Sequence, residues 1–159
     1  MKKPLHIAID TREQAPWHFP PDMAKVSRRT LKTGDYALIL DDGKVDAGFP
    51  VERKSLDDLV GTLSTGAKRW AKEVERMGAF GCMVVVVEGQ DSDIVQHKYN
   101  HPLVSPAMVT ARIVELAWMG VHVYLAADAM RASQIAWRHL YERWKQLNDP
   151  FYGVTRCKS

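Results

Sequence analysis

Residues 81–89, GCMVVVVEG, form the apolar run that most constrains the fold of this chain. A strand with one face in water alternates apolar and polar residues, whereas a continuous run is typical of a strand covered on both faces. Short strands and a hairpin come first in the sequence, and helices alternating with strands follow. This order predicts an α/β domain with a mixed central β-sheet flanked by helices.

Hydrophobic periodicity and turn signals define the expected elements. Strands are expected over residues 5–10, 25–31, 34–40, 45–54, 81–89 and 121–126, and helices over residues 55–64, 67–77, 105–120 and 128–147. The Asp-Gly pair in residues 41–44 predicts a tight hairpin turn. Pro50 cannot donate to a ladder, so we expect an open edge or a bulge there. Residues 90–104 show no pattern and are expected to be irregular.

Length and composition narrow the class of protein. A chain of 159 residues, 46% hydrophobic and 26% charged, is expected to fold as one domain over residues 1–150 with a short tail over 151–159. The net charge of +3 is compatible with an anionic partner but does not require one. Cys82 and Cys157 fit neither a disulfide framework nor a zinc site. No signal peptide or membrane span is visible, so we expect a soluble, cytoplasmic protein with no membrane partner.

Carboxylates gather at the ends of the expected strands. The stretches are DTRE with Asp10 and Glu13, GDY with Asp35, VERK with Glu52, and SLDD with Asp57 and Asp58. Alternate residues of a strand share a face, so Glu52 and Lys54 point the same way and Arg53 points the other way. If the hairpin pairs as expected, Asp35 begins one arm and Glu52 ends the other. The two carboxylates are then close together.

Clustered carboxylates favour a particular chemistry. They repel one another, which raises their pKa values unless a cation intervenes. A hard ion such as Mg²⁺ takes oxygen ligands, and one or two carboxylates plus substrate phosphate suffice to hold it. Such an ion orients and activates water and neutralises charge on a phosphodiester under attack. With Lys54 beside the site, the pattern favours metal-dependent phosphodiester hydrolysis.

Three stretches, DTREQ, TGDY and VERKSLDDL, together resemble the nuclease domain of the XPF family of structure-specific endonucleases. The family signature runs Gly-Asp, a gap, Glu-Arg-Lys, three residues, Asp. The resemblance covers residues 5 to about 78 by motif, and the order of the later elements agrees with it. It implies a restriction-endonuclease-like fold and a DNA endonuclease that uses Mg²⁺ or Mn²⁺ near branches and single-strand junctions.

The resemblance also implies roles for individual residues. It makes Asp10, Glu13, Asp35 and Glu52 ligands of the metal or of its water, Lys54 the catalytic lysine, Arg53 a residue that orders the site, and Asp57 the final acid of the signature. Arg69 and Glu73 would lie on the helix beside the site. Taken alone, Asp58 is expected to cap its helix, and Arg69 and Glu73 would be a surface pair.

Two departures from the family pattern concern DNA recognition. The gap between Asp35 and Glu52 is long, because the hairpin between them is extended. Because the sequence ends at Ser159, we also expect the tandem helix-hairpin-helix domain that follows the nuclease in eukaryotic and archaeal members to be missing. The chain resembles stand-alone versions from phages and bacterial mobile elements. A partner subunit that binds DNA is one way to replace the absent domain.

Basic residues flank the motif stretches and predict a surface that binds the DNA backbone, although ordinary solvated charge is the simpler interpretation for about half of them. The candidates are Arg12, Arg28, Arg29, Lys68, Arg69 and Lys72, with Lys25 and Lys32 nearby. His97 and His101 are four residues apart without a helical pattern, so we expect them to face solvent or DNA rather than a metal. Lys98 and Tyr99 can touch a phosphate or a base.

Aromatic and leucine side chains form a stripe on the last helix, at Trp137, Leu140, Trp144 and Leu147. Such a stripe is usually core, but its two tryptophans also suit an interface. Because the XPF family dimerises through late helices of this domain, the resemblance implies a homodimer through the C-terminal helix. Two other functions stay open: a DNA-docking subunit that does not cut, and a restriction-like enzyme that recognises a sequence.

Overall fold

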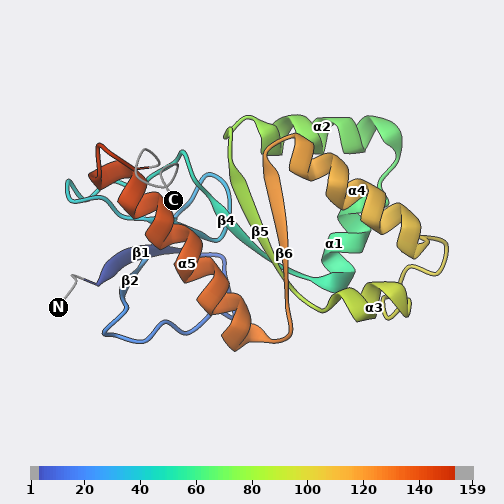
Figure 1. Cartoon of the computed structure of the whole chain (residues 1–159), viewed down its shortest axis with the longest axis horizontal. Coiled ribbons are helices and arrows are strands. Elements are labelled where there is room, and N and C mark those ends of the chain that lie inside the picture. Colours follow the sequence, from blue (N-terminus) through green and yellow to red (C-terminus); the bar gives the residue numbers. More distant parts are fainter. Residues whose placement is uncertain (1–3, 153–159) are drawn as a thin grey trace.

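The computed structural model describes residues 4–152, apart from the side chains at positions 67 and 73. Cys157 therefore lies outside the described residues. A six-stranded sheet in the order β2-β1-β3-β4-β5-β6 forms the centre of the molecule (Figure 1). Its strands are β1 (Leu5–Asp10), β2 (Ala24–Arg29), β3 (Tyr36–Leu38), β4 (Val51–Ser55), β5 (Met83–Glu88) and β6 (Val121–Ala126). The helices are α1 (Leu56–Leu63), α2 (Ala67–Gly78), α3 (Asp91–Val95), α4 (Pro106–Trp118) and α5 (Ala129–Asn148).

The sheet is mixed, as the sequence predicts. β1 pairs parallel with β2 and antiparallel with β3, and β3 pairs antiparallel with β4. β4, β5 and β6 then run parallel to one another. The parallel half places the carboxyl ends of β4 and β5 side by side, with Ser55 opposite Glu88. Side chains from the two strands therefore meet at one edge of the sheet.

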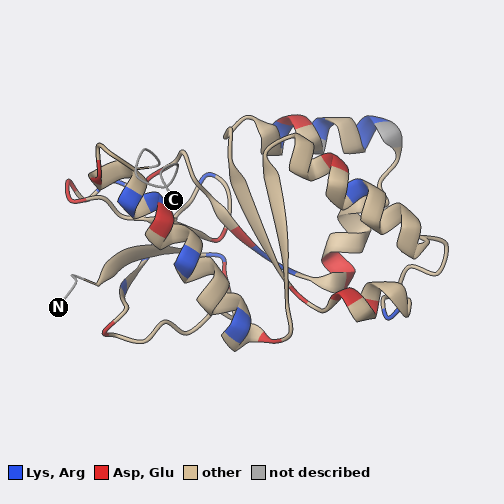
Figure 2. Cartoon of the chain, in the orientation of Figure 1, with Lys and Arg blue, Asp and Glu red and all other residues tan. Residues whose placement is uncertain are grey.

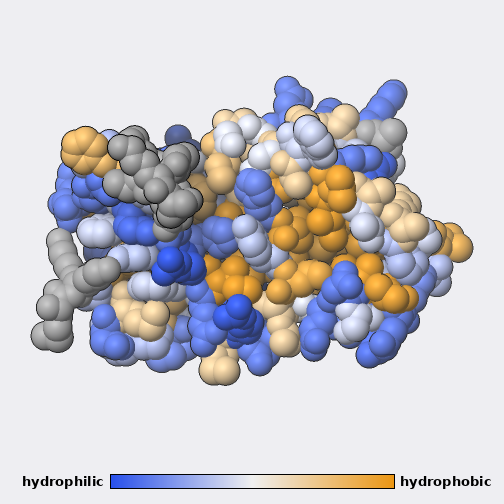
Figure 3. All heavy atoms as spheres, viewed as in Figure 1, coloured by the Kyte–Doolittle hydropathy of each residue, from blue (hydrophilic) through white to orange (hydrophobic). Residues whose placement is uncertain are grey.

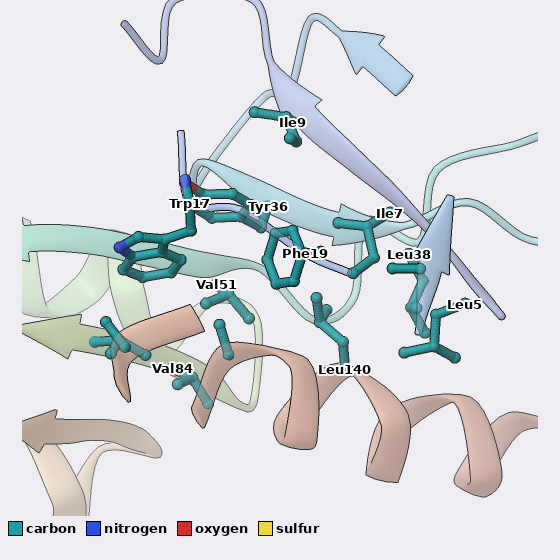
Figure 4. Close-up of a cluster of buried hydrophobic side chains, with 14 of the residues drawn as sticks. Leu5, Ile7, Ile9, Trp17, Phe19, Tyr36, Leu38, Val51, Val84 and Leu140 are labelled. Atoms are coloured by element: carbon teal, nitrogen blue, oxygen red, sulfur yellow. The ribbon is translucent and has the colours of Figure 1, made fainter. Parts of the chain in front are cut away.

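β5 is covered on both faces, which confirms the interpretation of its apolar run. Val84 and Val86 pack against α5 in one core, whose labelled side chains converge between the sheet and that helix (Figure 4). Val85 and Val87 pack into a second core with residues of α1, α2 and α4 on the opposite face. The alternation of strand side chains between faces accounts for this split.

Capping side chains set the helix starts that the sequence predicts. The side chains of Ser55, Ser105 and Asp128 accept hydrogen bonds from backbone N–H groups three residues on, at the starts of α1, α4 and α5. Gly120 ends the turn after α4 with φ of +80°, and a Cβ there would lie 2.7 Å from the carbonyl oxygen of Gly81. Only glycine fits that position.

Two expectations about local structure are wrong. Residues 90–104 are not wholly irregular, because they contain α3, and the backbone N–H of Gln90 donates to the Asp93 carboxylate at 2.9 Å. The hairpin is also much shorter than expected. Its ladder holds the Tyr36–Val51 pair, with an isolated bridge between Ile39 and Val45. The segment before Pro50 leaves the sheet, since proline offers no N–H to a ladder.

No helix among residues 4–152 combines the length and the apolar character that a bilayer crossing needs.

Candidate active site

β4 carries the central charges of the candidate site. The Nζ of Lys54 lies 2.9 Å from a carboxylate oxygen of Glu52, and both side chains are largely buried. Arg53 points to the opposite face, as the strand alternation predicts. Figure 2 shows acidic and basic segments following one another along β4, and an acidic segment at the end of β5. The short stretch from 52 to 54 thus supplies charge to both faces of the sheet.

Asp35 is held next to β4 by its backbone and its side chain. Its N–H donates to the Val51 carbonyl at 2.9 Å, and its Oδ2 accepts the backbone N–H of Arg53 at 2.8 Å. Gly34 precedes it with φ of +76°, and a Cβ there would meet Pro50 at 2.9 Å. Glycine at position 34 is therefore required for this close approach. Asp35 and Glu52 belong to adjoining chain segments, as the sequence predicts.

The surroundings of Asp35 disfavour its charge. Burial raises the pKa of this carboxyl to about 6, and the nearby carboxylates of Glu52, Glu13 and Asp10 act in the same direction. The hydrogen bond from the Arg53 backbone opposes them. No hydrogen bond to the second carboxylate oxygen of Asp35 is found within residues 4–152. This oxygen is thus available to a cation.

Asp10 lies in a different environment, although it is adjacent in the sheet. Only 1% of its surface is exposed, and its two oxygens accept bonds from the backbone and guanidinium of Arg12 and from the backbone of Leu31. The Arg12 guanidinium holds the pKa of Asp10 well below its usual range. In this arrangement the Asp10 carboxylate fixes the turn after β1. Its role as a metal ligand stays a prediction.

A hydrogen-bond network behind the site was missed by the sequence reasoning. Arg53 Nε and Trp17 Nε1 both donate to Oε1 of Glu88, each at 2.7 Å. The other end of the Arg53 guanidinium lies 3.3 Å from Oε1 of Glu13, which also accepts the backbone N–H of Ala15. The role of Arg53 in ordering the site thus has a structural basis, while Glu13 as a ligand stays a prediction.

The network continues into the core. The Trp17 ring stacks on Tyr36 with centroids 4.7 Å apart, and the backbone N–H of Trp17 donates to the Tyr36 hydroxyl at 2.9 Å (Figure 4). Tyr36 directly follows Asp35, so this contact also limits the movement of Asp35. One signal in the sequence could have found Glu88: it is a charge at the end of an otherwise apolar strand beside the strand of Glu52.

An open depression of about 550 Å³ adjoins the charged end of β4. Its lining includes Lys54, Asp57, Asp58, Arg69 and His101. Asp57 accepts the backbone and side-chain N–H groups of Asn100 at 2.7 and 3.0 Å, so it links α1 to the segment after α3. The signature leaves three residues between its lysine and its final acid, and that spacing selects Asp58 rather than Asp57. Arg69 lies beside the site, as the resemblance implies, whereas the side chain of Glu73 lies outside the described residues.

The six candidate DNA-binding residues differ in how far their side chains are engaged within the protein. Arg12 and Arg28 are engaged within the protein: Arg12 pairs with Asp10, and Arg28 donates to the carbonyls of Asp10 and Glu13. Arg29 is exposed and donates to the Arg28 carbonyl. The exposed Lys68, Arg69 and Lys72 lie on α2, where basic segments are visible in Figure 2, and no ion pair involves them among the described side chains. The α2 group is the stronger candidate for contact with phosphates.

The structure assigns different environments to Tyr99, His97 and His101 in the segment after α3. Tyr99 is buried and its hydroxyl donates to the Val104 carbonyl, so the prediction that this ring stacks on a base is wrong. His97 packs on Tyr99 with ring centroids 4.3 Å apart, and its Nε2 lies 3.2 Å from the His101 carbonyl. His101 lines the depression. Neither histidine forms part of a metal-ligand cluster in the described part of the chain.

Asp35 and Glu52 offer the donor set of a hard divalent cation. Carboxylate oxygens suit Mg²⁺ and Mn²⁺, which usually also keep water and bind substrate phosphate. Within residues 4–152 no three Asp, Glu, His or Cys side chains are close enough to form a complete protein site. The raised pKa of Asp35 among other carboxylates is the observation that fits a cation here. The residues therefore fit a metal bound by two carboxylates and completed by substrate.

The sequence matches the model of one protein family, the ERCC4 domain, over residues 9–136. This range covers most of the chain and includes every strand from β2 to β6. The chain belongs to the ERCC4-domain family. A search of curated proteins found no match. The expected resemblance to the XPF family is confirmed by this match.

Solved structures of XPF from Aeropyrum pernix share the fold. One has a TM-score of 0.62 at 20% sequence identity, and the match covers 86% of this chain and 60% of that chain. A second, in complex with DNA, has a TM-score of 0.63 at 20% identity, with 89% and 66% covered. The chain thus spans less than two thirds of the length of these XPF chains. The expected restriction-endonuclease-like fold of this ERCC4 domain is confirmed.

Proposed function

We propose that this ERCC4 domain is a divalent-metal-dependent DNA endonuclease that hydrolyses phosphodiester bonds. The observation that carries the proposal is Asp35, a carboxyl group with a pKa of about 6 that is fixed against the strand of Glu52 and Lys54. The open depression of about 550 Å³ adjoins the charged end of β4. Perturbed acids at the edge of a cleft are typical of catalytic sites.

Asp35 and Glu52 are the proposed ligands of Mg²⁺ or Mn²⁺. When bound, the ion supplies a Lewis acid for the phosphate and lowers the pKa of a bound water. Asp35 binds it in the ionised form, with the backbone N–H of Arg53 holding the other carboxylate oxygen in place. Asp10 and Glu13 are proposed as further ligands of the ion or of its water. In the structure Asp10 fixes the turn after β1, and Glu13 contacts the Arg53 guanidinium.

Lys54 is the proposed partner of the substrate. Its ammonium group contacts Glu52, and Lys54 also lines the depression, which suits contact with a phosphate oxygen there. A charge-assisted hydrogen bond from the ammonium holds that phosphate and stabilises the charge that develops during attack. Arg53 on β4 and Glu88 on β5 are hydrogen-bonded to each other and so tie the ends of the two paired strands together. This contact holds the neighbouring Lys54 in position.

The proposed substrate is branched DNA or a junction between duplex and single strand. Lys68, Arg69 and Lys72 on α2 form an exposed basic edge that suits backbone phosphates and carries no sequence information. A cytoplasmic location, a homodimer through the C-terminal helix and a DNA-binding partner subunit are further parts of this proposal. The exposed Trp144 and Leu147 near the end of α5 support the homodimer.

The test is cleavage of end-labelled flap, fork, splayed-arm and plain duplex DNAs, each with Mg²⁺, Mn²⁺ or EDTA. We expect metal-dependent cutting that prefers the branched substrates whatever their sequence. Cutting confined to one sequence in plain duplex would identify a restriction-like enzyme. Binding without cutting in either metal would contradict the proposal and indicate a docking subunit.

A further inference from the structure

A β-turn over residues 101–104 projects from the segment between α3 and α4. The backbone N–H of Val104 donates to the His101 carbonyl at 3.0 Å, which leaves Pro102 and Leu103 at the two corner positions. Proline fixes its own φ and stiffens the turn. Leu103 is 97% exposed. A corner of this kind usually carries glycine, asparagine or aspartate, so an exposed leucine here adds nothing to the turn itself.

The two ends of this turn are anchored. Tyr99 and Val104 are both 8% exposed, and the Tyr99 hydroxyl donates to the Val104 carbonyl at 2.7 Å. Asn100 is bound twice by Asp57 at the start of α1. The protein therefore holds Leu103 outward from a fixed base, without using its side chain in any core.

The turn lies at the rim of the candidate active site. His101, its first residue, lines the same depression as Lys54 and Arg69. A Cβ added at Gly61 of α1 would lie 3.4 Å from Nε2 of His101, so the turn packs closely against that helix. Leu103 is two residues further along. A strand whose phosphate enters the depression would bring its neighbouring bases to this leucine.

We propose that Leu103 is a wedge that enters the base stack of bound DNA next to the phosphate in the depression. This inference rests on the proposed function, because its ligand is the DNA that the site would cut. Apolar side chains inserted between base steps unstack and kink a duplex. Unstacking costs least where pairing is already interrupted. The wedge therefore favours branch points over continuous duplex, from within the nuclease domain itself.

The test uses a flap DNA with 2-aminopurine at the branch point, in Ca²⁺ in place of Mg²⁺ so that binding is read without cutting. We expect the full chain to raise the fluorescence on binding, since 2-aminopurine brightens when it is unstacked. Leu103→Ala is expected to lose most of this rise and to bind the flap about 5- to 10-fold more weakly. Its melting temperature should shift by less than about 2 °C, because the side chain is exposed.

Met130→Ala is the matched control, because Met130 is another exposed apolar residue, at the start of α5. The Met130→Ala variant should keep the full fluorescence response. A 2-aminopurine placed well inside the duplex should remain dim with every variant. An unchanged response in Leu103→Ala, or no response in the unaltered chain, overturns the wedge. If the response depends on Leu103 but Mg²⁺ and Mn²⁺ give no cutting, the nuclease proposal fails and the wedge stands.

Discussion

Asp10 and Asp35 show how one sheet separates the roles of two similar acids. Their chain segments are joined by a hydrogen bond of 2.8 Å from the Asp10 N–H to the Asp35 carbonyl. The carboxylate of Asp10 is saturated by N–H donors and its pKa falls, whereas burial near other carboxylates raises the pKa of Asp35. The ionised Asp10 thus fixes the turn after β1, and Asp35 is the acid whose charge a cation would stabilise.

The pKa of Asp35 predicts how stability depends on pH in the absence of metal. Its value of about 6 in the folded protein exceeds its ordinary value of 3.8, so the folded chain binds this proton more tightly than the unfolded chain. The stabilising contribution is complete below the ordinary value and is lost as the pH rises through about 6. In Asp35→Asn this loss disappears. From pH 4 to pH 7.5, the free energy of unfolding should therefore fall by about 1–2 kcal/mol more in the unaltered chain than in Asp35→Asn.

Urea unfolding of both proteins in EDTA at the two pH values measures this difference. Asp22→Asn serves as the control, because Asp22 is exposed and no hydrogen bond or ion pair of its side chain is found within residues 4–152. A pH response of Asp35→Asn identical to that of the unaltered chain would contradict the assigned pKa.

At the scale of elements, local signals in the sequence predicted most of the helix and strand positions. Ser55, Ser105 and Asp128 cap their helices as expected, because capping depends on residues only three apart. The contacts of Glu88 were missed, because its partner Trp17 is 71 residues away. Such a contact depends on how β1, β4 and β5 are placed, which short-range patterns do not determine. The shortened hairpin has a local cause instead, because Pro50 has no N–H to donate and the segment before it leaves the sheet.

The Ser55 cap connects element stability to the site, because it directly follows Lys54. Loss of a serine cap costs about 1 kcal/mol in free energy of unfolding. We expect Ser55→Ala to lose about that much and also to reduce the cutting rate several-fold, since the start of α1 fixes the end of β4. Thermal unfolding and single-turnover cutting provide the two readouts.

Asp128→Ala removes an equivalent cap, from α5. This variant should lose as much stability as Ser55→Ala but cut at the rate of the unaltered chain. Equal loss of cutting in the two variants would show that stability alone is responsible and that the α1 start has no special role.

At the scale of the whole molecule, the C-terminal helix divides between core and surface. Leu140 is fully buried, whereas Trp144 and Leu147 are 36% and 44% exposed. Figure 3 also shows hydrophobic side chains on the surface over β6, between α5 and α4. The prediction that the stripe is core therefore holds for its first half. Its second half, Trp144 and Leu147, is the surface at which the homodimer is proposed to form.

Sedimentation at micromolar concentration tests that homodimer. We expect a dimer for the unaltered chain and a monomer for Leu147→Glu, because a charge at an apolar interface is costly to bury. Met130→Glu, which places the same charge on an exposed residue at the other end of α5, should leave the dimer intact. A monomeric unaltered chain at this concentration would rule out the proposed interface.

The most direct test of the central claim is single-turnover cutting of one flap DNA in Mg²⁺ by the unaltered chain and by Glu52→Gln. The substitution keeps the size of the side chain and removes the charge that would hold the metal. We predict that the unaltered chain cuts, that EDTA abolishes cutting, and that Glu52→Gln cuts at least about 100-fold more slowly while still binding the flap. Cutting by Glu52→Gln within a few-fold of the unaltered rate would contradict a metal-dependent active site at Asp35 and Glu52.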